Sequence, residues 1–166
     1  KKFLKNNEVI INMAAMHYPR AATDQLISLF KTFSAVAVVG ARQVGKSTLL
    51  RHLFEGKADF VVFDPLIDVE NARRDPELFL DNHRLPLVLD EIQYAPQVLS
   101  SLKRRIDANR QPGQYLFSGS QQWGVMKLLA ESLAGRVVFL DLDGFSQAEA
   151  GQFPQASPWL RGWLDS

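Results

Sequence analysis

The sequence predicts an α/β fold: a three-layer α/β/α sandwich around a five-stranded, mostly parallel sheet. Three observations predict it. Five short apolar runs of strand length alternate with helical patterns along the 166 residues. A glycine-bounded loop follows the first of these runs and leads directly into a helix. Hydrophobic residues make up 46% of the chain, which is enough for one domain with a sizeable core. Alternating strands and helices of this kind form βαβ units, with helices covering both faces of the sheet.

The strands are predicted from apolar runs rich in valine, leucine and phenylalanine. Each run is three to five residues long and is bounded by polar residues, glycine or proline, as expected of buried strands. In chain order the predicted strands are residues 35–39, 60–63, 87–89, 115–117 and 137–140.

The helices are predicted from apolar spacing and from start and stop signals. Asp75-Pro76-Glu77 has the pattern of a capping residue followed by proline, which opens a helix. Ser146 and Glu149 have the spacing of a capping box. Pro112-Gly113 and Gly135 end helices. The remaining predicted helices are residues 22–31, 48–54, 97–109 and 125–133.

Composition excludes several classes of function. The formal net charge is +1, which gives no overall argument for nucleic acid or for an acidic partner. The chain has no cysteine, so disulfides, thiol chemistry and cysteine-based zinc sites are excluded. No apolar run approaches the roughly 18 residues that a membrane span needs. These features lead us to expect a cytoplasmic protein with no membrane segment.

The domain organisation is predicted to be simple. Residues 20–150 contain all the predicted strands and most of the helical pattern, and we expect them to form one core domain. Residues 1–19 are expected to be an N-terminal extension that contributes little to the fold. Residues 151–166 are expected to be the start of a truncated C-terminal region.

The glycine-bounded loop has the complete pattern of a phosphate-binding loop. Glycine at both ends allows backbone conformations and close approaches that a Cβ atom would obstruct. Successive backbone N–H groups, with the positive end of the following helix dipole, can then surround a polyphosphate. The strand before the loop and the helix after it provide the context that the motif requires. The loop comprises Gly40, Ala41, Arg42, Gln43, Val44, Gly45, Lys46 and Ser47.

The last residues of this loop have distinct predicted roles. Lys46 is expected to reach the β- and γ-phosphates of a nucleoside triphosphate, and the Ser47 hydroxyl to hold Mg²⁺. Thr48 lies one place beyond the motif, so it is the less favoured metal contact.

Two adjacent acidic residues supply the second half of the predicted site. Asp90 and Glu91 follow the apolar run 87–89, and Asp90 lies 44 residues after Lys46. Ligands of parallel sheets bind at the carboxyl ends of the strands, which is where Gly40 also lies. Asp90 is predicted to hold Mg²⁺ through water, and Glu91 to orient and deprotonate an attacking water. A glutamate beside the metal aspartate favours hydrolysis over phosphate transfer to a second substrate.

Three further residues are candidates with open alternatives. Ser118 and Ser120 lie at the end of the fourth strand and could sense the γ-phosphate, but Ser-Gly-Ser is also ordinary turn chemistry. The sequence does not separate the two serines. Arg136 lies at a helix-to-strand junction, where it is either an arginine finger that acts on another subunit or an exposed arginine that closes the helix.

Taken together, these motifs closely resemble a known family. Four segments are similar to motifs of prokaryotic AAA-type ATPases. They are GARQVGKSTLL at 40–50, LVLDEIQ at 87–93, FSGSQQ at 117–122 and ESLAGRV at 131–137. In that family the C-terminal half is a nuclease-like domain of unknown function. The resemblance covers about residues 20–150.

This resemblance implies an AAA+ core with strand order 5-1-4-3-2 that binds ATP and Mg²⁺. Walker A would be residues 40–47 and Walker B would be Asp90 with Glu91. A sensor would lie in residues 118–120, and an arginine finger at Arg136 would make a homo-oligomer the expected assembly. It also implies that the α/β/α sandwich is of the P-loop NTPase kind. Only 24 residues follow the end of the fifth predicted strand at about residue 142, so we expect the helical lid and the C-terminal effector domain of that family to be missing, and turnover from this core alone to be low.

Other functions compete with ATP hydrolysis. A nucleotide-dependent switch that recruits protein or DNA is the main alternative, and a P-loop kinase is disfavoured by Glu91. Nucleic acid has weak support from a basic patch, because such a run is more often a solvated helix face and the net charge is nearly balanced. This patch comprises Lys103, Arg104, Arg105 and Arg110.

Overall fold

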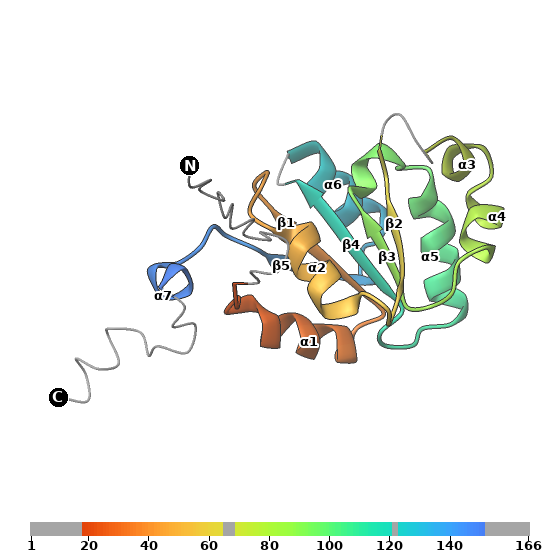
Figure 1. The fold of residues 1–166 in the computed structure, drawn as a ribbon. Helices are drawn as coiled ribbons and strands as arrows, with labels where there is room; N and C mark the ends of the chain where they lie inside the picture. Colours follow the sequence, from red (N-terminus) through yellow and green to blue (C-terminus); the bar gives the residue numbers. More distant parts are fainter. Residues whose placement is uncertain (1–17, 65–68, 121–122, 152–166) are drawn as a thin grey trace, which may run out of the picture.

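A computed structural model describes residues 18–64, 69–120 and 123–151, and all structural statements below concern these residues. Its centre is one five-stranded sheet in which every strand pair is parallel (Figure 1). The order β2-β3-β4-β1-β5 confirms the predicted 5-1-4-3-2 order, read from the other edge. The strands are β1 (Ala35–Gly40), β2 (Asp59–Val62), β3 (Leu87–Asp90), β4 (Tyr115–Ser120) and β5 (Val137–Asp141).

Helices cover both faces of the sheet (Figure 1). One face is packed by the first two helices, α1 (Ala22–Thr32) and α2 (Lys46–Phe54). The other is packed by α5 (Val98–Ala108) and α6 (Trp123–Ser132), with α3 (Val69–Arg74) and α4 (Pro76–Asp81) beyond the β2 edge. The remaining elements are the single-turn 3₁₀ helix η2 (Ile92–Tyr94) and the short helix α7 (Gln147–Ala150).

The core has two halves, one on each face of the sheet. Strand β1 shows the division, because side chains alternate between the faces of a strand. Val36 and Val38 pack against α1 and α2, whereas Ala35, Ala37 and Val39 pack on the opposite side. All six residues of β1 and of β4 are buried, so these central strands have helices on both sides. This burial explains why the strands are continuous apolar runs rather than alternating patterns.

The local signals for helix starts are confirmed by capping contacts. The Asp75 side chain accepts a hydrogen bond of 3.0 Å from the Leu78 N–H, and Pro76 occupies the first helical position. Ser146 and Glu149 form both hydrogen bonds of a capping box. Gly135 follows α6 with a positive φ angle of 71°, as is common just after a helix end. Helix α5 instead ends at Ala108 with Asn109 as its C-cap, so Gly113, whose φ is 75°, belongs to the turn that comes later.

One strand is longer than its apolar run predicts. Strand β4 continues through Ser118, Gly119 and Ser120, because these residues pair in register with the end of β1. In this register Val38 faces Ser118 and Gly40 faces Ser120. These three residues are not apolar, so a pattern that counts apolar side chains does not include this part of the strand.

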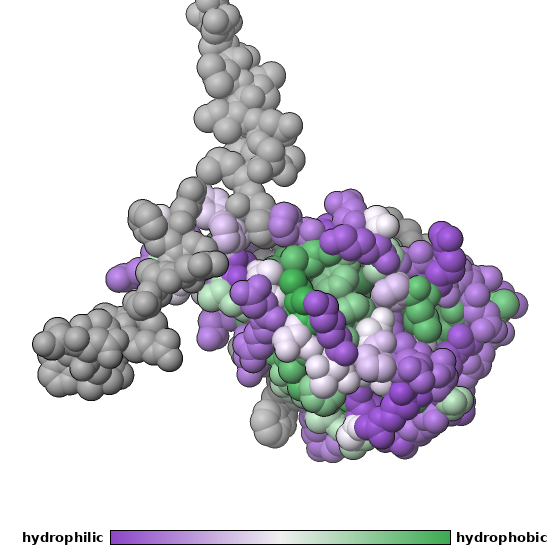
Figure 2. All heavy atoms as spheres, turned by 90° about the horizontal axis from the view of Figure 1, so that it is seen from below, coloured by the Kyte–Doolittle hydropathy of each residue, from purple (hydrophilic) through white to green (hydrophobic). Residues whose placement is uncertain are grey.

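The surface shows a mixed character. Figure 2 views the molecule from the α1 side, where hydrophobic residues gather toward the middle of the face and hydrophilic residues surround them. The large exposed hydrophobic residues of the described chain are separated in sequence: Phe33, Val62, Leu78, Leu85 and Phe145. None of the helices described has the length and apolar character that crossing a bilayer requires.

Candidate functional site

The sheet topology brings the predicted motifs to one edge. Strand β1 ends at Gly40, β3 ends at Asp90 and β4 ends at Ser120. These three strands are neighbours and parallel, so their carboxyl ends lie side by side. The glycine-bounded loop begins at this edge and leads into α2 (Figure 1). This edge is where ligands bind in open parallel sheets.

The loop takes backbone conformations that favour glycine. Gly45 has a φ of 93° and Gln43 has a φ of 65°, both in the left-handed region. Helix α2 begins directly after Gly45, and no side chain caps its first turn. The N–H groups of that turn therefore point out of the helix start together with the positive end of its dipole. This geometry suits an anion.

Gly40 is required by a close approach of another chain segment. A Cβ atom at this position would lie 2.3 Å from the carbonyl oxygen of Leu142, which is backbone and cannot yield easily. The approach is fixed by a hydrogen bond of 2.7 Å from the Leu142 N–H to the Val39 carbonyl. The segment after β5 therefore packs directly against the start of the loop.

Lys46 lies inside the loop rather than in solvent. Its residue surface is only 5% exposed. Its Nζ donates hydrogen bonds of 3.1 Å to the Gly40 carbonyl and 2.8 Å to the Ala41 carbonyl. Both acceptors are neutral, and an ammonium group binds anionic phosphate oxygens more strongly than neutral carbonyls. The loop thus holds a buried cation at the place where phosphate oxygens would need one.

Ser47 and Asp90 come together, as the sequence predicts. The Ser47 hydroxyl donates a hydrogen bond of 2.9 Å to Oδ1 of Asp90, which is 2% exposed. Hydroxyl and carboxylate oxygens are ligands that Mg²⁺ accepts, with substrate phosphates and water completing its shell. The described residues contain no cluster of three or more His, Cys, Asp or Glu side chains for a metal.

The structure separates the two candidate serines by their contacts. The buried Ser118 hydroxyl accepts a hydrogen bond of 3.0 Å from the Glu91 N–H and donates one to Oδ1 of Asp90. Ser120 lies on the same strand beside Gly40, close to the loop. Ser118 therefore holds the acid pair in place, and Ser120 is the serine nearer to the loop entrance.

Glu91 adopts a conformation that turns the chain sharply after β3. Its φ is 58°, and η2 follows immediately. Its Oε2 accepts a hydrogen bond from Nε2 of Gln93. Glu91 and Gln93 line a cavity of about 410 Å³ together with Arg42, Gln43 and Tyr94. A water molecule next to Glu91 would have space in this cavity.

A second cavity also borders the loop. It has a volume of about 270 Å³, and Gln43 lines both cavities. Its wall includes the loop residues Val44 and Gly45, and also Thr48. The wall of this second cavity also includes Tyr18, Arg20 and Phe145, whereas Glu91 lines the first.

The largest cavity described is elsewhere. It measures about 900 Å³ and lies between β2 and helices α3 and α4. None of the predicted site residues lines it, and its wall lacks the glycine loop and the acid pair. Chemistry rather than size therefore identifies the candidate site.

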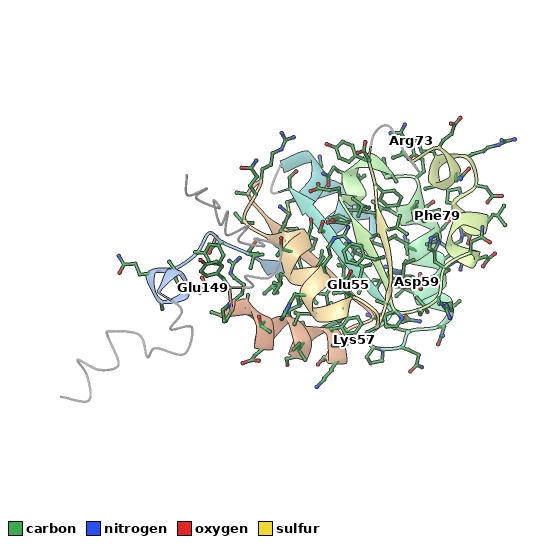
Figure 3. The ribbon with its side chains drawn as sticks, viewed as in Figure 1. Glu55, Lys57, Asp59, Arg73, Phe79 and Glu149 are labelled. Atoms are coloured by element: carbon green, nitrogen blue, oxygen red, sulfur yellow. The ribbon has the colours of Figure 1, made fainter. Side chains whose placement is uncertain are left out.

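Arg20 and Glu149 form a buried ion pair in this region, and the sequence did not predict it. Nε of Arg20 donates a hydrogen bond of 3.0 Å to Oε1 of Glu149, and both side chains are about 5% exposed. Glu149 also accepts bonds of 2.8 Å from the N–H groups of Ala21 and Ser146. Figure 3 shows Glu149 beside the start of α1. No sequence signal links two residues 129 positions apart.

These contacts determine the ionisation of Glu149. Burial by itself raises its pKa, but hydrogen bonds from the Ser146 and Ala21 N–H groups and from Arg20 lower it from 4.5 to about 2. A carboxyl group whose pKa is lower in the folded state contributes stability above its unfolded pKa. That contribution is lost as the pH falls from about 4.5 toward about 2.

We therefore expect a measurable acid dependence of stability. The Glu149 carboxylate should contribute on the order of 3 kcal/mol to the free energy of unfolding at neutral pH, less in the acid range. Glu149→Gln should be less stable at pH 7 and should lose less stability between pH 5 and pH 2.5 than the wild type. Urea unfolding at pH values from 7 to 2.5 measures the free energy of unfolding of both proteins, and hence how steeply each loses stability as the pH falls. Glu131→Gln, which alters an exposed ion pair with Lys127, is the control and should follow the wild-type slope.

Arg136 is not brought to this site. It lies just before β5, whose first residue pairs with Ala35 at the start of β1. Gly40 is five residues further along, about 16 Å at the usual rise of a strand. Nε and Nη2 of Arg136 bind the Asp107 carboxylate at 2.6 and 2.7 Å, and the Arg136 hydrogen bond lowers the pKa of Asp107. Arg136 therefore cannot reach a ligand on the loop of its own chain.

The basic patch on α5 is largely engaged in ion pairs with α4. Arg104 binds Glu77 at 2.5 Å, and Arg105 binds both Glu77 and Asp81. The hydrogen bond from Arg104 is the main reason why the pKa of Glu77 is lowered. Arg110 donates to the Gly135 carbonyl. These partners favour the interpretation of the patch as an ion-paired helix face.

Comparisons with known proteins identify one family and several relatives. A family model described as an AAA domain matches residues 32–151. Uncharacterized proteins of Mycobacterium bovis and Mycobacterium tuberculosis are each 35% identical over 130 residues, which is 78% of this chain and 29% of each relative. The matched part of the chain thus spans less than a third of the length of these relatives.

A solved structure shares the fold. The Walker-type ATPase PABY2304 of Pyrococcus abyssi superposes with a TM-score of 0.54 at 14% sequence identity. The match covers 90% of this chain and 59% of that protein. This likeness supports the arrangement of strands and helices described above.

Proposed function

The chain belongs to the AAA domain family, and from this premise we propose that it binds ATP with Mg²⁺ and hydrolyses the nucleotide. The observation that carries the proposal is the meeting of four functional groups at one edge of the sheet. The Lys46 ammonium is buried in the loop, the Ser47 hydroxyl bonds the Asp90 carboxylate, and Glu91 follows directly.

The phosphates would bind to the loop. Backbone N–H groups of residues 40–48 and the start of α2 supply donors, and Lys46 would exchange its carbonyl contacts for the β- and γ-phosphates. Ser47 and Asp90 would hold Mg²⁺, whose role is to neutralise the charge on these phosphates. Ser47 is preferred over Thr48 because Ser47 is the residue bonded to Asp90.

Hydrolysis would take place on the side of the 410 Å³ cavity. Glu91 would orient a water molecule and accept its proton, a role in which positioned side chains contribute about 10²–10⁴ in rate. Ser118 would keep Asp90 and the Glu91 backbone in their places. Ser120, nearer to the loop, is the better candidate for sensing the γ-phosphate.

The base would occupy the other cavity. Tyr18 and Phe145 pack edge-to-face there, with ring centroids 5.5 Å apart, beside Thr48. Aromatic walls suit the flat face of a purine. The family membership favours adenine.

A complete active site would need a second subunit. Arg136 lies at the edge of the sheet opposite to the loop, so it can serve as an arginine finger only for a neighbouring copy. We propose a homo-oligomer for this reason. In full-length proteins of this type, the core of residues 20–150 would drive a C-terminal effector domain.

A nucleotide-dependent switch is the second candidate function. Gln93 engages the carboxylate of Glu91, and Arg136 is bound to Asp107 of its own chain. With both groups engaged in this way, the core would hold ATP and hydrolyse it slowly until a partner arrives.

Phosphate release from Mg·ATP, measured over a hundredfold range of protein concentration, tests the proposal. An ATPase with an arginine finger in trans should show a specific activity that rises with concentration, and Arg136→Ala should remove the rise. A constant, very low rate with tight ATP binding would support the switch instead. An absence of both binding and phosphate release would contradict both functions.

A further inference from the structure

We infer that Arg20, held in place by Glu149, is a positioning residue for the phosphate-binding loop. The inference rests on the proposed function, because it assigns Arg20 to the same nucleotide site. It adds two residues that lie outside the loop and outside the acid pair, one before α1 and one in α7. Neither residue belongs to a nucleotide-binding motif.

Arg20 fixes the direction of one peptide unit in the loop. Its Nη1 donates a hydrogen bond of 2.8 Å to the Val44 carbonyl. In a trans peptide the carbonyl and the next N–H point in opposite directions. The Val44 carbonyl points toward Arg20, so the Gly45 N–H points away from it. Gly45, with its φ of 93°, is the residue that turns the loop into α2. Arg20 therefore sets the direction of an N–H group that the phosphates would need.

Arg20 can do this because its other donors are anchored. Its Nε binds Glu149 and its Nη2 donates a bond of 2.6 Å to the Asp143 carbonyl. Its guanidinium also lies over the ring of Phe145, 4.5 Å from the centroid. A planar guanidinium with contacts in three directions has little freedom to rotate. The residue is 7% exposed, so solvent does not compete strongly for these bonds.

Glu149 supplies the charge that makes this burial favourable. A buried guanidinium needs an anionic partner, and Glu149 is the carboxylate that binds Arg20 among the residues described. Its second oxygen accepts the Ser146 N–H in the capping box, which fixes the carboxylate to α7. Through Arg20, the position of α7 is coupled to the geometry of the loop. A change at Glu149 should therefore weaken nucleotide binding although Glu149 does not line either cavity beside the loop.

Arginine variants test this coupling. We expect Arg20→Ala to weaken Mg·ATP binding about tenfold and Arg20→Lys to weaken it less, since one ammonium keeps the charge but cannot span all three oxygen acceptors. Arg51→Ala is the matched control, because Arg51 also lies over an aromatic ring, Phe60, at 4.6 Å, and in the described part of the chain its side chain makes no hydrogen bond to the loop. Its affinity for Mg·ATP should equal that of the wild type. Calorimetric titration measures the affinities, and thermal unfolding measures the folded fraction of each variant.

A double-mutant cycle separates positioning from general stability. If Glu149 acts through Arg20, Arg20→Ala with Glu149→Ala should bind Mg·ATP no more weakly than Arg20→Ala alone. Losses of affinity that add in the double variant would overturn the inference. So would an Arg20→Ala protein that is folded and binds Mg·ATP as the wild type does.

The remaining outcomes are also decisive. If Arg20→Ala does not fold, Arg20→Lys takes its place, and wild-type affinity in this variant would overturn the inference. If the wild type binds Mg·ATP and Lys46→Ala does not, while both Arg20 variants keep full affinity, only the role of Arg20 is wrong. If the wild type itself binds no nucleotide, the proposed function fails and this inference fails with it.

Discussion

Replacing Lys46 with alanine is expected to reduce the affinity for Mg·ATP at least a hundredfold while leaving the fold intact. The ammonium is buried in the loop, and its hydrogen-bond partners within the described residues are the carbonyls of Gly40 and Ala41. Each hydrogen bond between charged groups contributes about 1.5–3 kcal/mol, and Lys46 can make at least two to the phosphates. Loss of two such bonds exceeds the 2.8 kcal/mol that corresponds to about a hundredfold change in affinity.

The control for this variant is Lys57→Ala. Lys57 follows α2 at its far end and is exposed, with its Nζ bonded to the Leu53 carbonyl (Figure 3). The Lys57→Ala variant loses the same positive charge from the same part of the chain, but the substituted position lies away from the loop. Titration with Mg·ATP should give wild-type affinity for Lys57→Ala. Equal affinity of Lys46→Ala and wild type would refute the assignment of the phosphate site.

Glu91→Gln is expected to separate binding from hydrolysis. Glutamine has nearly the shape of glutamate but cannot accept the proton of an attacking water. We expect phosphate release to fall by about 10²–10⁴, the usual contribution of a positioned base. The affinity for Mg·ATP should change by less than a few fold, because Ser47, Asp90 and the loop remain in place. Single-turnover phosphate release and calorimetric titration provide the two measurements.

Glu55→Gln is the matched control for Glu91. Glu55 is exposed immediately after α2, at the end of that helix far from the loop (Figure 3), and its change removes one carboxylate as the change at Glu91 does. Its phosphate release should match the wild type. A Glu91→Gln protein that hydrolyses ATP at the wild-type rate would show that another group activates the water.

Much of this architecture could be predicted because its signals are local. The loop is contiguous, and the apolar runs before it and before Asp90 mark buried strands. The Asp75 and Ser146 caps depend on side chains that bond within three residues of themselves. The strand order, in contrast, came from the family resemblance, because the spacing of the runs does not specify which strands are neighbours.

The contacts that the sequence could not provide are long-range. The Arg20–Glu149 ion pair joins residues 129 positions apart, and Glu149 already had a sufficient local explanation as part of a capping box. The bond between Ser118 and Asp90 exists only because β3 and β4 are neighbours in the sheet. Ser118 and Ser120 also interrupt the apolar pattern of β4, so the sequence predicts that this strand ends earlier than it does in the structure.

The most direct test of the central claim is the structure of this chain with Mg²⁺ and a non-hydrolysable ATP analogue. We predict that the triphosphate lies along the backbone N–H groups of residues 40–48. The Lys46 Nζ should move from the Gly40 and Ala41 carbonyls to the β- and γ-phosphates, with Mg²⁺ beside Ser47 and Asp90. The account is contradicted if the analogue, at a saturating concentration, binds elsewhere and Lys46 keeps both carbonyl contacts.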